Sequence, residues 1–170
     1  MKMKLALLQY KTRGLLKSNP SLRTTLPYKQ SHSIGILFTA ENKQKHEEIK
    51  ELIKKLELDG KKVTVISFLP KNTENFDFLF DFFSEKDVNF WGTVTSENAI
   101  RFTEMPFDFL LYLDTTPNPM LMHLIARSKA HCRAGRFWSG FEKYFELMIE
   151  SKETTRSLIE GIYKYTSVLH

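Results

Sequence analysis

The stretch from Phe107 to Gly135 constrains the fold most, because its pattern is that of a strand, a turn, a helix and the start of another strand. Residues 109–113 are short and continuously apolar, as expected for a strand buried on both faces. In the turn at residues 114–119, Asn118 is suited to cap a helix and Pro119 to begin it. Strand, helix and strand in this order form a βαβ unit, which predicts a mostly parallel sheet.

A second βαβ unit precedes the first one in the chain. Residues 34–38 and 63–68 are apolar and rich in β-branched side chains, which predicts two more buried strands. Between them, apolar residues recur at helical spacing from Ile49 to Leu56, and Gly60 is a typical helix stop. After Gly135, a strand is expected at residues 144–149 and a closing helix at residues 154–169.

These elements predict one three-layer α/β domain over residues 34–170, Rossmann-like, with a mostly parallel sheet of about five strands. One segment stays undecided: in residues 76–83, phenylalanines alternate with polar residues, but several also share one helix face. A strand and a helix therefore remain open for this segment.

The charge of the chain is concentrated in residues 1–33, which carry seven of the 25 lysine and arginine residues and no acid. A helix is expected at residues 2–17, with leucines on one side, and the polar segment 18–33 is typical of an extended connector. We therefore expect a basic helical arm and connector, residues 1–33, before the α/β body.

A basic arm on a nearly neutral body is typical of proteins that dock on an anionic partner. The preferred partner is RNA or the ribosome, and an anionic membrane surface is an alternative because leucines lie opposite the lysines. In a third interpretation the arm simply packs on the body and its lysines are solvated. The predicted partner-binding residues are Lys2, Lys4, Lys11, Arg13, Lys17, Arg23 and Lys29.

A ligand cleft is expected at residues 114–118, because open α/β sheets bind ligands at the carboxyl ends of their strands. Its candidate residues are Asp114, Thr115, Thr116 and Asn118. If the protein is a small enzyme acting on a sugar- or nucleotide-like ligand, Asp114 is the candidate base; otherwise it is a structural turn residue. The first βα turn, residues 38–42, contains no glycine, and no GxxxxGK[ST] motif occurs, so no nucleotide cofactor is expected.

Other reactive side chains give weaker signals. Arg127, Lys129, Arg133 and Arg136 form a basic cluster that is either an anion site or a solvated helix end. The histidines lack metal-site spacing, so no metal is expected. The single cysteine, Cys132, suits a reducing cytoplasm and is expected to be either buried or activated by its basic neighbours. No apolar run is long enough for a membrane helix.

The segments FDFLLYLD and LIARSKAHCRAG resemble an uncharacterised bacterial family, typical of Bacteroidetes, with a signature of the form FDLLI…SKAKFRVG. The matching positions are residues 107–111, 128–130 and 133–135. Members of that family have a basic N-terminal helix before a Rossmann-like body and no known function. This resemblance therefore implies the organisation of the chain and not an activity.

The same region more weakly resembles the N-terminal half of heptosyltransferase-like GT-B glycosyltransferases, which run from a YDLVIDL strand to an A.RRIG segment. Such enzymes bind their nucleotide sugar mainly through a second domain, for which 170 residues leave no room. This likeness supports the fold and argues against the glycosyltransferase activity itself.

Overall fold

The computed structural model describes residues 1–73 and 78–170. Within these residues, six parallel strands form one sheet in the order β3-β2-β1-β4-β5-β6. The strands are β1 (Ser33–Thr39), β2 (Lys62–Phe68), β3 (Asp81–Phe83), β4 (Phe109–Tyr112), β5 (Cys132–Arg136) and β6 (Leu147–Ile149). This strand order is that of dinucleotide-binding α/β folds. The predicted fold class is confirmed, with six strands where about five were expected.

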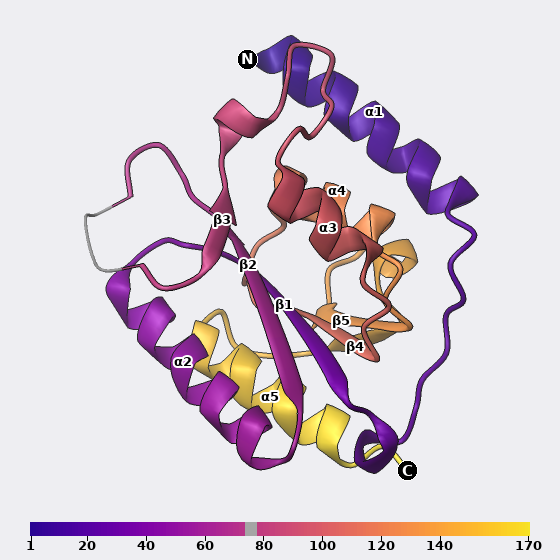
Figure 1. Cartoon of the computed structure of the whole chain (residues 1–170), viewed down its shortest axis with the longest axis vertical. Helices are drawn as coiled ribbons and strands as arrows, with labels where there is room; N and C mark the ends of the chain where they lie inside the picture. Colours follow the sequence, from indigo (N-terminus) through magenta and orange to yellow (C-terminus); the bar gives the residue numbers. More distant parts are fainter. Residues whose placement is uncertain (74–77) are drawn as a thin grey trace.

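Helices cover both faces of the sheet (Figure 1). On one face lie α2 (Lys43–Leu58) and α5 (Thr155–Ser167), and on the other lie α3 (Glu97–Glu104) and α4 (Pro119–Arg127). Alternate residues of each strand serve the two faces: in β1, Phe38 packs in the cluster that contains α2 and α5, and Leu37 in the opposite one. The result is the predicted three-layer arrangement.

The helix boundaries follow the local signals in the sequence. Asn118 accepts a hydrogen bond from the Met120 backbone N–H, and Pro119 is the first residue of α4. Ser96 caps α3 in the same way through the Ala99 N–H. Gly60 ends α2 with a φ of 79°, a conformation that side chains other than glycine rarely adopt.

The sheet edges are where the expectations from sequence differ from the structure. The part of the undecided segment 76–83 that forms regular structure is a strand, β3, which pairs with β2. Phe83 points into the core and Phe82 is exposed, because side chains alternate along a strand. Residues 76 and 77 lie outside the described residues. The expected strand at 144–149 is shorter: residues 142–144 form a 3-10 turn, and β6 begins at Leu147.

The N-terminal segment forms α1 (Lys2–Ser18), which lies outside α4 and adds a further layer on that side (Figure 1). Residues 19–27 then run extended along the body, and a 3-10 turn (Tyr28–Gln30) leads into β1. None of the helices in the described part of the chain is long and apolar enough to cross a membrane.

Candidate functional site

The carboxyl ends of β1 and β4 lie side by side where the strand order reverses. In open α/β sheets this position forms a crevice that binds ligands. The structure places Asp114 here, directly after β4, as the sequence predicts.

Asp114 is almost completely buried, with 1% of its surface exposed, and both carboxylate oxygens accept hydrogen bonds. Oδ1 lies 2.7 Å from the Thr39 backbone N and 2.7 Å from Lys45 Nζ. Oδ2 accepts from the Thr39 hydroxyl at 2.6 Å, and the Tyr112 hydroxyl lies 3.1 Å away. The Asn118 side chain closes the group by donating to Thr39 Oγ1 at 2.8 Å. We call these five residues the switch-point network.

Lys45 is the member of this network that sequence reasoning missed. It lies in the first turn of α2, and its side chain is 3% exposed and also approaches Glu41 at 3.2 Å. A lysine in the first helical turn opposes the helix dipole, so it needs a compensating anion. That unfavourable position was the signal in the sequence, but it does not identify Asp114 as the partner.

The network resembles a buried ion pair more than an acid–base site. A general base needs a lone pair that a substrate can reach, whereas the carboxylate of Asp114 is surrounded by donors from its own chain. Burial, together with the charge of Asp114, raises the pKa of Tyr112 well above its usual value, so this phenol stays protonated. The arrangement joins β1, α2 and the turn after β4.

The other residues of the predicted cleft take structural roles in the same turn. The Thr115 carbonyl accepts from Arg136 Nη1 at 3.1 Å and from Trp138 Nε1 at 3.3 Å. The Thr116 carbonyl lies 3.1 Å from the Tyr112 hydroxyl. The turn is therefore fixed to β4, to the end of β5 and to the segment that follows β5.

The predicted basic cluster is not brought together at one place. Arg133 is buried and pairs with Glu146, with Nη2 2.6 Å from Oε1. Arg127 and Lys129 both lie against Glu104. Arg136 binds the Thr115 and Ser151 carbonyls and approaches Glu153 at 3.6 Å. Each cation thus has an acceptor within the protein, and Arg127 and Lys129 share one, which fits a helix-end or structural role.

The helix α1 is seated on the body through its leucine side. Leu8 is fully buried in the cluster that contains α4, and the hydroxyl of Thr12 lies 2.8 Å from His123 Nδ1 of α4. The loop that contains Gly92 contacts another side of α1. Gly92 has a φ of +69°, and a Cβ at this position would lie 2.5 Å from the Leu8 backbone N, so the close approach requires glycine. After α1, the Asn19 amide donates to the Ala126 and Ser128 carbonyls at the end of α4.

The seven predicted partner-binding residues fall into two groups. Lys4, Lys11 and Arg23 donate hydrogen bonds to the body, at the Glu85 carbonyl, the Thr93 hydroxyl and the Ala130 carbonyl. The second group is exposed, and none of its members forms an ion pair with any residue that the structure describes: Lys2, Arg13, Lys17 and Lys29. The first group helps to seat the arm, and the second remains available to a partner.

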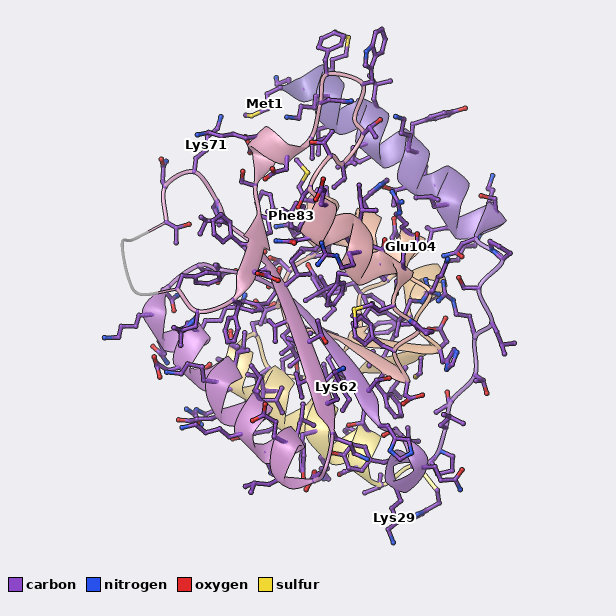
Figure 2. All side chains as sticks on the ribbon, in the orientation of Figure 1. Met1, Lys29, Lys62, Lys71, Phe83 and Glu104 are labelled. Atoms are coloured by element: carbon purple, nitrogen blue, oxygen red, sulfur yellow. The ribbon has the colours of Figure 1, made fainter. Side chains whose placement is uncertain are left out.

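Exposed aromatic side chains occur on α1 and in the loop that contacts it. Tyr10 on α1 is 75% exposed, and in the loop that contacts α1 through Gly92, Phe90 is 59% and Trp91 67% exposed. The Phe90 and Trp91 rings meet edge to face at 5.4 Å. In Figure 2, the label Met1 marks the N-terminal end of α1, around which side chains project away from the body. We call the following residues the outer surface of α1: Lys2, Met3, Tyr10, Arg13, Lys17, Phe90 and Trp91.

Sequence reasoning found the cations of this surface but not its aromatic residues. Phe90 and Trp91 lie about 80 positions from α1 in the chain, in a segment whose pattern indicates only a turn or a strand end. Their position beside α1 depends on the contact at Gly92, which no local pattern shows.

The remaining candidates are buried or dispersed. Cys132 is buried and burial raises the pKa of its thiol, so the inert alternative fits the structure. His123 is buried under α1. Among residues 1–73 and 78–170, no three histidine, cysteine or acidic side chains are grouped as a metal site requires.

Comparisons with known proteins identify the family and leave its activity open. No curated protein and no solved structure matches the chain, so the likeness to glycosyltransferases stays a resemblance of one segment. A model of a family of unknown function, DUF6913, matches residues 4–169, which confirms the resemblance to an uncharacterised family. The chain belongs to the DUF6913 family.

Proposed function

We propose that this protein binds single-stranded RNA, free or within the ribosome, through the outer surface of α1, and that it does so without catalysis. The observation that carries the proposal is the orientation of α1. Its leucine side packs on α4, so the side that faces solvent presents exposed cations without ion-pair partners in the described residues. Exposed aromatic rings lie on the same helix, at Tyr10, and in the loop that contacts the helix at Gly92.

This combination suits single-stranded RNA for two physical reasons. Lysine and arginine side chains neutralise phosphates and release counterions, which gives affinity that is independent of sequence. Exposed aromatic rings stack on unpaired bases, contributing roughly 1–3 kcal/mol for each base. A surface that only kept the protein in solution would need the cations but not Tyr10, Phe90 and Trp91.

The seating of α1 favours RNA over an anionic membrane. An amphipathic helix that lies in a membrane buries its apolar side in the lipid. In this structure Leu8 is fully buried and Leu5 packs against the same cluster, so these leucines face α4. Membrane binding would then depend on residues outside the leucine side, or on α1 leaving its seat.

The charge test reverses three exposed cations of the surface together, Lys2→Glu, Arg13→Glu and Lys17→Glu. Binding of a labelled single-stranded oligonucleotide is measured by anisotropy over a range of salt. For every phosphate that the variant no longer neutralises, the slope of log affinity against log salt should decrease by roughly 0.7. The matched control changes the net charge equally on the opposite side of the molecule, at Lys43, Lys54 and Lys62, which are all exposed.

The aromatic test replaces Phe90 and Trp91 by alanine. Affinity for the oligonucleotide should fall while the salt slope stays unchanged, because stacking does not release counterions. Sedimentation with ribosomes and with anionic liposomes compares the two anionic surfaces. If both variants bind RNA as tightly as the unchanged protein, or if only liposomes are bound, the RNA proposal is wrong.

A further inference from the structure

A cavity of about 460 Å³ lies on the other flank of α1, away from Gly92. Its walls come from α1, from the turn after β4 with the start of α4, and from residues 140–144 after β5. It is therefore close to the carboxyl ends of β4 and β5, one strand away from the filled crevice of the switch-point network. Its volume lies within the range of roughly 300–1,000 Å³ that is usual for small-molecule sites.

One wall of the cavity is aromatic. The rings of Phe141 and Tyr144 lie 5.4 Å apart, inclined by 33°, and both line the cavity. Phe141 also contacts Trp138 behind it, at 6.0 Å, so the wall is supported by further ring packing. Leu16 and Met122 provide apolar lining from α1 and α4. Such a surface suits one face of a planar ring.

The polar part of the lining has one sign of charge. Arg13 and Gln9 line the cavity from α1, and both are exposed. Among the described residues that line the cavity there is no carboxylate, and Arg13 forms no ion pair with any of them. A guanidinium without a partner favours an anionic group, and it can bind a phosphate through two parallel hydrogen bonds. The Gln9 amide can both donate to and accept from a base edge.

We infer that this cavity, which we call the α1 cavity, binds a nucleotide: a nucleobase placed against Phe141 and Tyr144, with its phosphate held by Arg13. The nucleotide is either free in solution or one unit of an RNA strand. The cavity and the outer surface of α1 share Arg13, but Phe90 and Trp91 do not line the cavity. The two sites can therefore be tested separately.

The first experiment measures binding of AMP, UMP, adenosine and inorganic phosphate to the full chain by titration calorimetry. Both monophosphates should bind with saturation, adenosine more weakly, and inorganic phosphate weakest, because the cavity recognises the ring and the charge together. If neither monophosphate binds, or if inorganic phosphate binds as tightly as AMP, the inference is overturned.

Variants locate the binding. Arg13→Gln keeps a polar side chain but removes the charge, and should lower the affinity for AMP about tenfold or more while leaving that for adenosine unchanged. The matched control is Lys17→Gln, which removes the same charge one turn further along α1 and outside the cavity. Leu16→Trp places an indole at the lining from a half-buried position and should abolish binding of both ligands. An equal loss in Arg13→Gln and Lys17→Gln would show nonspecific attraction and overturn the inference.

Competition identifies the source of the nucleotide. If saturating AMP displaces the oligonucleotide, the cavity receives a unit of the strand; if both bind together, its ligand is a free nucleotide. Phe90→Ala with Trp91→Ala should weaken RNA binding and leave AMP binding unchanged. Failure of the RNA proposal therefore leaves the calorimetry with AMP as an independent result, and the reverse also holds.

Discussion

The crevice between β1 and β4 differs from the outer surface of α1 in the burial and pairing of its polar groups. In the crevice, Asp114 and Lys45 are buried and satisfied by their own chain. On the outer surface, Arg13 and Lys17 are exposed without an ion-pair partner in the part of the chain that the structure describes. At the position where this fold commonly binds ligands, the polar groups are therefore satisfied within the chain, whereas these exposed cations lie on the added helix.

The largest expected effect comes from breaking the buried pair. Asp114→Asn leaves the buried ammonium of Lys45 with only the half-exposed carboxylate of Glu41 as a counter-charge, which should lower the free energy of unfolding by about 3 kcal/mol in urea titrations. Asp114→Asn combined with Lys45→Met should recover part of that loss, because no unpaired charge remains. If Asp114→Asn is instead as stable as the unchanged protein but no longer binds a ligand that the unchanged protein binds, the crevice is the functional site.

The seat of α1 should come next in magnitude. Leu8→Ala removes a fully buried side chain between α1 and the body and should cost about 3 kcal/mol of unfolding free energy. Met3→Ala, on the exposed side of the same helix, is the matched control and should change it by less than about 0.5 kcal/mol. If the two changes cost the same, α1 is not part of the folded core.

The pH dependence of the free energy of unfolding tests the contact between α1 and α4 through His123, a residue of α4. Burial, with the positive charges of Arg127 and Lys11, lowers the pKa of His123 to about 4. The unfolded chain, with a histidine pKa near its usual value of about 6.5, then binds more protons between these two values, so stability falls as the pH falls through this window. The loss should reach about 2 kcal/mol by pH 5.

His123→Gln should remove part of that slope in denaturation curves recorded from pH 8 to pH 5, because burial also lowers the pKa of His46, which contributes to the same window. The carboxyl groups of Asp59 and Asp108 do not interfere, because their pKa values are lowered below the usual carboxyl range and their effect comes at more acidic pH. An unchanged slope in the variant would mean that other groups carry the acid sensitivity.

The smallest expected effect on stability is that of changing the exposed cations on the outer surface of α1. Arg13→Gln and Lys17→Gln together should change the free energy of unfolding by less than about 0.5 kcal/mol, since exposed charges without partners contribute little to stability. RNA binding in the same protein should weaken measurably. A large loss of stability would show that these cations have a structural role like that of Lys45.

The sheet was predictable because its central strands are continuous apolar runs. β3 has only three residues, too few for its pattern to be distinguished from a helix, and it is the strand that the expected number of about five leaves out. The switch-point network was only half predictable: Asp114 follows a recognisable strand, but its partner Lys45 lies 69 positions away. The leucines of α1 showed that the helix has an apolar side, but the same pattern fits docking on a protein and insertion in a membrane.

The seat of α1 on α4 has a consequence for the order of events during synthesis. The ribosome makes α1 more than a hundred residues before it completes α4, which ends at Arg127. At about 5–20 residues per second, α1 is synthesised roughly 5–20 s before α4, the helix on which it packs, is complete. During this interval Leu8 has no partner on the body, and the lysines and arginines of the helix keep the nascent segment hydrated. We therefore expect the positive charge of the arm to favour the solubility of the chain until α4 is complete.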